Sequence, residues 1–463
     1  MLKGYEEYMP FPNFWLDSIP QNWKSLKIKR IFDERTEKGH PNEQLLAATQ
    51  NKGVIPKTLY ENRTVVAQKG FELLKFVKVG DFVISLRSFQ GGIEYAHYQG
   101  IISPAYTIMI PSKKINPDYF RYLAKSKLFI ELLKNCVTGI REGQNIDYSK
   151  LKNFELPLPT SDEQNQIVRY LDAKVAKINR LISAKKKEIA LLKEHKQAII
   201  TRAITKGLDE NVEMKDSGVE WIGEIRFDCD IVPLKTTTRN QLMYGANSSG
   251  ITYSKDLPRY VRITDITSDG DLKNIGLLSL PKELSNKYLL SEGDILFARS
   301  GATVGKSFLY HNRFGKCCFA GYLIKYSPNI ELVLPEFVHY YTYSGVYLQW
   351  LKQIFIQATI QNISAEKYKQ LPLILPPIHH QENIVNYLNH EIIKIDNLID
   401  YIIYETDLFK EYKTRLISDV VTGKVDVRGI HVEDVSDVEL IEEFDEEIVD
   451  EFDAETSEEE NIE

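Results

Sequence analysis

The segment from Gly301 to Ser307 approaches the spacing of a nucleotide-binding motif. A phosphate-binding loop needs a glycine, four further residues and then Gly-Lys-Ser or Gly-Lys-Thr, so that enough backbone N–H groups wrap the phosphates. Here only three residues separate Gly301 from Gly305, and Ser300 occupies the position where the first glycine is required. We therefore do not predict an NTP site, and an ATPase at this loop or a cryptic nuclease is the alternative interpretation.

No other segment has the spacing of a catalytic or metal-binding motif. Residues 375–378, Leu-Pro-Pro-Ile, lack the acidic or amide residue and the aromatic residue of an amino-group methylation motif. Neither HExxH nor a nucleophile elbow occurs, and the cysteines form no CxxC pair. The sequence predicts free thiols, no metal, no cofactor and no catalytic activity of the isolated chain. The cysteines are Cys136, Cys229, Cys317 and Cys318.

Polar side chains suited to DNA contact recur at matched positions along the chain. Arg87-Ser88 and Arg299-Ser300 each follow an apolar segment. Arginine can grip a phosphate or make a bidentate contact to guanine, and an amide can read adenine. A surface turn is the alternative for the arginines, and a shared structural turn for the amides, because the helix N-cap types Asp147 and Ser364 follow them. The candidate contacts are Arg87, Ser88, Gln90, Gln144, Asn145, Arg299, Ser300, Lys306, Gln361 and Asn362.

An internal repeat must position these residues. Residues 144–209 align without a gap to residues 361–426 at an offset of 217, with 25 identities in 66 positions. A period of this length is too long for a solenoid. It indicates a duplicated unit made of a globular segment followed by a long helix.

Each copy of the repeat carries apolar residues at heptad spacing, and neither proline nor glycine interrupts 160–206 or 378–422. Each helix could run for about 44 residues, or about 66 Å. Such a stripe needs a partner, so we expect an intramolecular antiparallel coiled coil, with separate packing of each helix as the alternative. The predicted seam comprises Leu171, Val175, Ile178, Ile182, Ile189, Leu192, Leu388, Ile392, Ile395, Ile399, Ile402 and Phe409.

The globular segments that precede the helices have mixed α and β character. Phe82–Leu86 and Ile295–Ala298 are predicted to be buried strands, and each follows a Gly-Asp pair. Pro117–Leu133 and Pro335–Ile354 are predicted to be helices. Beyond these elements the two segments match poorly, which suits two heads with different ligand sites.

Charge is unevenly distributed along the chain. The formal net charge is −7, but residues 432–463 contain 17 Asp and Glu and no Lys or Arg, which leaves +10 on residues 1–431. A basic body is compatible with a phosphate-contacting surface, and an acidic block of this kind is usually disordered. The N-terminus lacks the apolar core of a signal peptide, and no apolar run is long enough to span a membrane. We expect a cytoplasmic protein.

Several short motifs occur in a characteristic order over about residues 15–425. They are Ile19-Pro20-Gln21-Asn22-Trp23, Leu156-Pro157-Leu158-Pro159 with Glu163-Gln164, Ile167 and Leu171, then Ser217–Ile225, and Gly293-Asp294-Ile295-Leu296 with Arg299-Ser300-Gly301. Together they resemble the specificity subunits of type I restriction–modification systems. The chain departs from that pattern at residues 226–230, where the usual Ile-Pro-x-x-Trp is missing, and at 377–380, where a polar cap is common.

In that family the heads are target recognition domains, and the helices form an antiparallel coiled coil that sets their spacing and docks two modification subunits. The complex methylates adenine with S-adenosylmethionine. With restriction subunits it also translocates and cleaves unmethylated DNA using ATP, as a defence against phage. The resemblance implies a non-catalytic subunit that recognises a bipartite site in double-stranded DNA. A coiled-coil scaffold that binds only proteins is the other alternative.

The predicted fold class is α+β, with two α/β-mixed heads separated by two long helices. The expected domains are a first target recognition domain at 1–158, a first conserved helix at 159–206, a second recognition domain at 207–375, a second conserved helix at 376–425 and an acidic disordered tail at 426–463.

Overall fold

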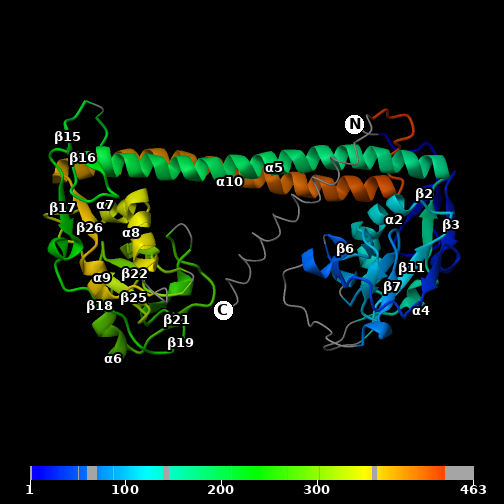
Figure 1. The fold of residues 1–463 in the computed structure, drawn as a ribbon, viewed down its shortest axis with the longest axis horizontal. Helices are drawn as coiled ribbons and strands as arrows, with labels where there is room; N and C mark the ends of the chain where they lie inside the picture. The colour runs from blue at the N-terminus through cyan, green and yellow to red at the C-terminus, as the bar shows by residue number, and fades with distance from the viewer. Residues whose placement is uncertain are drawn as a thin grey trace. The chain divides into compact units, whose positions relative to one another are not determined.

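The computed structural model divides into two compact units, each of which combines one head with part of helix α5 and part of helix α10 (Figure 1). Unit 1 contains the described residues up to 186 and from 403 onward, and unit 2 contains those from 187 to 402. The structure describes residues 3–50, 52–59, 70–86, 88–138, 145–209, 211–267, 270–301, 303–356 and 362–432.

A four-stranded antiparallel sheet of the same strand pattern lies at the centre of each head. The order is β4-β11-β8-β9 in unit 1 and β18-β25-β22-β23 in unit 2. The predicted combination of two repeated heads with mixed helix and strand content is therefore confirmed. The bounds are β4 Phe32–Arg35, β8 Phe82–Ile84, β9 Glu94–Tyr95, β11 Thr107–Pro111, β18 Met243–Tyr244, β22 Ile295–Ala298, β23 Ser307–Leu309 and β25 Leu323–Tyr326.

The two strands predicted from the sequence are β8 and β22, and a matching turn leads into each. Gly80 and Gly293 both have a left-handed backbone, with φ of 90° and 81°, which favours glycine. The carboxylates of Asp81 and Asp294 each accept a hydrogen bond from the backbone N–H three residues earlier, at 2.8 and 2.9 Å. The same turn chemistry therefore starts the central strand in both heads.

The two helices predicted from the sequence are each broken into two, so that part of the prediction was wrong. Ser126 and Ser344 lie at the breaks, and each hydroxyl donates to the carbonyl three residues earlier at 2.7 Å. Each hydroxyl also accepts from the N–H three residues later at 3.4 Å, so serine competes with the helical backbone bonds. The helices are α2 Pro117–Ala124, α3 Lys127–Lys134, α7 Pro335–Tyr341 and α8 Gly345–Ile356.

A short antiparallel strand pair closes each head where the chain enters the long helix. In unit 1, β3 (Lys24–Lys27) pairs with β14 (Glu155–Leu158). In unit 2, β17 (Asp230–Pro233) pairs with β26 (Pro372–Leu375). The beginning and end of each head are therefore joined just before the helix starts.

The long helices are α5 (Ser161–Lys206) and α10 (Ile378–Val421), and segments of the two contact each other within each unit. In unit 1, residue numbers rise along one helix as they fall along the other, so those segments run antiparallel. The polar contacts are Lys185 Nζ–Glu405 Oε2 at 3.2 Å and Lys413 Nζ–Asn179 Oδ1 at 2.8 Å in unit 1, and Lys196 Nζ–Asp396 Oδ1 at 2.6 Å in unit 2.

The residues predicted as a helical seam all lie on covered faces. Leu171, Ile178, Leu388, Ile392, Ile395, Ile399 and Ile402 are buried, and Val175, Ile182, Ile189, Leu192 and Phe409 are half-buried. The core of unit 1 includes Ile178 and Leu416, and the core of unit 2 includes Ile200 and Leu388. The helices therefore contribute apolar side chains directly to the head cores.

A buried glutamine at the same position of each repeat connects the helix to its head. Gln164 accepts a hydrogen bond from the N–H of Asn116 at 2.6 Å, and Gln381 accepts one from the N–H of Leu334 at 2.9 Å. Each side-chain amide also donates to two backbone carbonyls. Because Asn116 and Leu334 directly precede α2 and α7, each glutamine fixes the head's first helix against the start of the long helix.

The polar residue beside each glutamine differs between the units. Glu163 is buried and accepts hydrogen bonds from Trp23 Nε1 at 2.9 Å and Asn22 Nδ2 at 3.1 Å. Its counterpart His380 contacts Asp228 Oδ2 at 3.0 Å. Bidentate hydrogen bonds from Arg226 to Asp228 lower the pKa of that carboxyl to about 2. The two departures from the family pattern therefore meet in one polar cluster.

The C-terminal part of the described chain packs on unit 1. Val427 is fully buried, and Gln166 Nε2 donates to the carbonyls of Val427 and Ile430 at 3.1 and 2.6 Å. Residues 426–432, the start of the predicted tail, are thus packed, whereas the acidic residues beyond them lie outside the described residues.

All four cysteines are buried and unpaired, which confirms the predicted free thiols. Burial raises the pKa of each thiol, to about 11 for Cys136 and about 12 for Cys229. Within the described ranges, no cluster of three or more His, Cys, Asp and Glu side chains could hold a metal ion. The helices that the structure describes include none long and apolar enough to cross a membrane.

We predict that Gln381→Leu lowers the free energy of unfolding by about 2–4 kcal/mol, because it leaves a buried N–H and two carbonyls without their partner. Urea unfolding of the full chain measures this change. Gln353→Leu, at an exposed position of α8, is the control and should stay within about 0.5 kcal/mol of the parent. Equal stability of the two variants would contradict the role given to Gln381.

Candidate nucleic-acid interface

The loop that follows β22 carries three of the predicted DNA contacts. It is a hairpin, because β22 and β23 pair antiparallel and the N–H of Ala298 donates to the carbonyl of Lys306 at 2.8 Å. Arg299 and Ser300 therefore leave the sheet beside Lys306, on the same loop. The loop joins two strands and does not lead into a helix.

The geometry of this hairpin does not support an NTP site. The N–H of Val304 donates to the carbonyl of Gly301 at 3.1 Å, and the N–H of Lys306 to that of Thr303 at 3.0 Å. The N–H of Gly305 donates to Ala298 at 2.9 Å. These donors are used inside the loop, so they cannot wrap a phosphate as a phosphate-binding loop requires.

Arg299 is held in place by two neighbours. Its guanidinium lies over the ring of Tyr244, 4.8 Å from the centroid, and its Nε donates to Asn362 Oδ1 at 3.4 Å. The tyrosine is itself fixed, because its hydroxyl accepts from the N–H of Ala365 at 2.9 Å. The structure therefore brings together Arg299 and Asn362, which the sequence analysis selected only because similar residues recur in the other half of the chain. Arg299 is half-buried and Asn362 is exposed.

Two aromatic residues at this site could not be selected from the sequence. Tyr244 stacks on the arginine, and Tyr322 is 61% exposed while its carbonyl accepts the N–H of Arg299 at 3.1 Å. The chain contains 26 tyrosines, and neither of these two stands in a motif that distinguishes it. An aromatic ring that faces solvent beside an arginine can stack on a sugar or base edge.

The corresponding loop in unit 1 has a different form. A one-turn helix, α1 (Ser88–Gly91), lies between β8 and β9. Ser88 is buried, and its hydroxyl accepts from the N–H of Ser85 at 2.8 Å, so its assignment as a DNA contact was wrong. Gln90 is exposed and accepts from Gln50 Nε2 at 3.1 Å. Arg87 lies outside the described residues.

The amide pairs precede a capped turn in both units, as the structural alternative predicted. Asp147 accepts from two backbone N–H groups at the start of α4 (Tyr148–Leu151), and Ser364 accepts from one at the start of α9 (Ala365–Lys369). Asn145 and Asn362 nonetheless remain exposed. Asn145 lies in β13 (Asn145–Ile146), whereas Gln144 and Gln361 lie outside the described residues.

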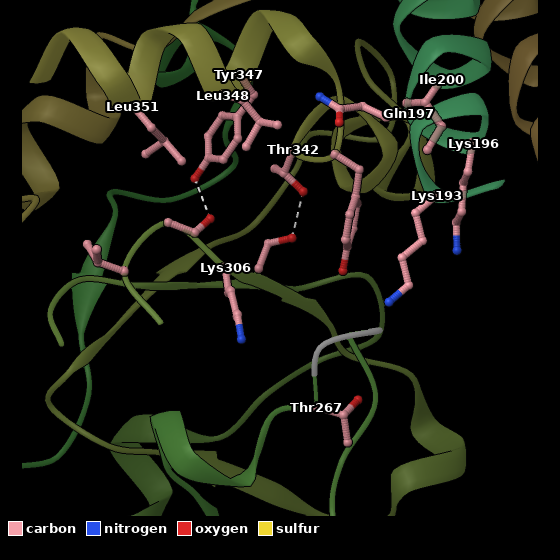
Figure 2. A pocket seen from close by; sticks show the side chains of 14 residues that line it. Lys193, Lys196, Gln197, Ile200, Thr267, Lys306, Thr342, Tyr347, Leu348 and Leu351 are labelled. Atoms are coloured by element: carbon pink, nitrogen blue, oxygen red, sulfur yellow. Dashed lines mark hydrogen bonds between the residues drawn. The ribbon is translucent and has the colours of Figure 1, made fainter. Parts of the chain in front are cut away.

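A hollow of about 350 Å³ lies in unit 2 beside the hairpin (Figure 2). Lys306 reaches it from the loop, while Lys193 and Lys196 reach it from α5. Apolar and hydroxyl groups from α8 and from the segment between α7 and α8 form another wall. Here Ser307 Oγ lies 2.7 Å from Thr342 Oγ1, and the Tyr347 hydroxyl donates to the carbonyl of Gly305 at 2.7 Å. We call this feature the lysine hollow.

The positive charge of the lysine hollow comes from its lysines. His339 lies beside it, with Nδ1 3.3 Å from Ser307 Oγ, and burial lowers its pKa to about 4. This histidine is therefore neutral at pH 7. Lys196 is paired with Asp396 at 2.6 Å, so its charge is compensated within the unit.

The sequence matches the family model of the type I restriction modification DNA specificity domain over residues 20–191 and 247–399. A relative named for the MjaX type I restriction enzyme specificity subunit of Methanocaldococcus jannaschii is 24% identical, over 92% of this chain and 99% of its own. The MjaVIII specificity subunit of the same organism is 24% identical over 89% of this chain and 95% of its own. The first matched segment covers most of the first head and much of α5, and the second covers most of the second head and the first half of α10.

A chain from a solved type I restriction–modification system has the same fold. The two superpose with a TM-score of 0.66 at 15% sequence identity, over 88% of this chain and 99% of that one. A subunit of this family selects the DNA sequence and is not itself an enzyme. On the strength of the family match, this chain belongs to the DNA specificity subunits of type I restriction–modification systems.

Proposed function

We propose that each head reads one half of a split site in double-stranded DNA, and that the chain brings two modification subunits and the restriction subunits to that site. One observation carries this proposal. The two heads share their central sheet, the turn into its central strand and the glutamine that fixes the long helix, but they differ in the loop that follows that strand. A shared scaffold with different loops suits two different half-sites.

The second head offers a restrained arginine for base recognition. Stacking on Tyr244 and the hydrogen bond to Asn362 limit the rotamers of Arg299, which lowers the entropy lost when it binds. Its remaining N–H groups can contact guanine or a phosphate. In the first head, Gln90 and Asn145 are the exposed candidates, and Arg87 stays a prediction.

We propose that the paired segments of α5 and α10 belong to one antiparallel coiled coil that sets the distance between the half-sites. The burial of the predicted seam and the antiparallel contacts in unit 1 support it. The outer face of α10 supports docking of modification subunits, because Ile393 in unit 2 and Tyr404 in unit 1 are 60% and 62% exposed. The proposed domains keep the predicted bounds, except that residues 426–432 pack on unit 1. The acidic segment beyond them is proposed to be dispensable for site choice, and the complex is proposed to act in the cytoplasm.

We predict that Arg299→Ala relaxes one position of one half-site and costs about 1–3 kcal/mol of binding free energy, because a bidentate base contact is lost. The measurement is the adenine-methylated motif made by the reconstituted complex, together with duplex binding. Arg239→Ala, at an exposed arginine of the same head, is the control and should leave the motif unchanged. If Arg299→Ala also leaves affinity and motif unchanged, Arg299 belongs to an ordinary surface turn.

We also predict that inserting four residues after Lys186 and four after Tyr404 lengthens the gap between half-sites by about one base pair. Lys185 lies before the first insertion point and Glu405 lies after the second, so their contact within unit 1 is kept. Four helical residues add about 6 Å of rise and about 40° beyond a full turn, and one base pair adds about 3.4 Å and a similar rotation. Sequencing of methylated DNA reads the gap. Altered half-site bases with an unchanged gap would refute the spacer role.

A further inference from the structure

The lysine hollow contains positive charge that the protein itself does not neutralise. Among the described residues, neither Lys193 nor Lys306 has a carboxylate within ion-pair distance, whereas Lys196 is paired with Asp396. Figure 2 shows that the side chains of Lys193 and Lys306 come to the hollow from two different elements, α5 and the hairpin loop. Two like charges directed at one space repel each other until an anion enters it.

Comparison of the two repeats shows that Lys193 has no acidic residue three positions earlier in its helix, where its counterpart has one. The residue at the same repeat position of α10 is Lys410, which is paired with Asp407 three residues earlier, at 2.9 Å. The residue three positions before Lys193 is Ala190. The first copy of the repeat therefore has an alanine where the second copy has the aspartate that pairs with its lysine.

The position of Lys306 connects the hollow to the loop proposed to read bases. Its carbonyl accepts the N–H of Ala298, the residue before Arg299, so the two cationic side chains leave neighbouring points of one hairpin. The backbone N–H groups of Val304, Gly305 and Lys306 are used inside the loop, so they are not available for the cradle that a free nucleoside triphosphate requires. Lysine amino groups without such a cradle suit a single phosphate that is held in place by the rest of a larger ligand.

We propose that the lysine hollow is a phosphate site, in which Lys193 of α5 and Lys306 of the hairpin together bind one phosphodiester group of the DNA backbone. The site rests on the proposed function, and it would fix the position of the second head on the duplex while Arg299 reads sequence. Because one lysine belongs to the long helix, the site also ties the helix to the DNA. A phosphate contact carries no sequence information of its own.

The test measures the affinity of a labelled DNA duplex for the complex of this chain with its modification subunits, at several salt concentrations. The duplex carries the sequence that the complex methylates. Lys193→Ala and Lys306→Ala should each weaken binding about tenfold, on the site and on a scrambled duplex alike. Each single substitution should reduce the slope of log affinity against log salt concentration by about 1. The double variant should show the same reduction in slope as either single variant, because both lysines bind one phosphate. Ala190→Asp should act in the same direction by giving Lys193 an internal partner.

Three controls keep these outcomes distinct. Lys352→Ala, at an exposed position of α8 outside the hollow, should leave the slope unchanged, and Lys306→Arg should retain binding. Thermal unfolding of each variant reports whether the fold is intact. If the wild-type complex has no sequence preference, the proposed function itself fails, independently of the hollow.

The proposal is overturned by an unchanged salt slope in the folded double variant. It is equally overturned if the loss is confined to the duplex that carries the site, because that result indicates base reading. Binding of ATP or pyrophosphate to the wild-type chain, lost in Lys306→Ala while duplex binding is unchanged, would assign the hollow to a free phosphate ligand instead.

Discussion

The structure depends on the burial of helix ends inside the head cores. A helix with one apolar stripe is not stable alone in water, and neither head closes its core without side chains such as Ile178 and Leu388 from the helices. The buried amides of Gln164 and Gln381 add the polar part of this constraint, because each satisfies three backbone groups at the junction. Each head is therefore fixed to its own helix segments, while the parts of the heads outside the shared central sheet differ between the units.

Much of the architecture could be predicted from the sequence, because it depends on repeated patterns. Heptad spacing and the absence of proline and glycine predicted both long helices, and the Gly-Asp pairs located the central strands. The breaks at Ser126 and Ser344 were missed, because the apolar spacing continues through them and only the local hydroxyl bonds interrupt the helix. The partner of His380 was missed as well, because Asp228 lies far from it in sequence.

The candidate site could be predicted only in part. Matching positions in the two halves drew attention to Arg299 and Asn362, and the structure joins them, but the same reasoning wrongly included the buried Ser88. Tyr244 and Lys193 could not be found this way, because their role depends on which elements meet in space. The hydrogen bonds of the hairpin argued against a nucleotide site more firmly than glycine spacing did, because the N–H groups of Val304, Gly305 and Lys306 are used inside the loop.

The proposed function requires one chain to hold two reading heads at a fixed separation. The most direct measurement is sequencing of adenine methylation in DNA exposed to the complex of this chain with its modification subunits. We expect one motif made of two short, different half-sites separated by a constant number of unspecified bases. A single contiguous motif, or two half-sites at variable separation, would contradict it.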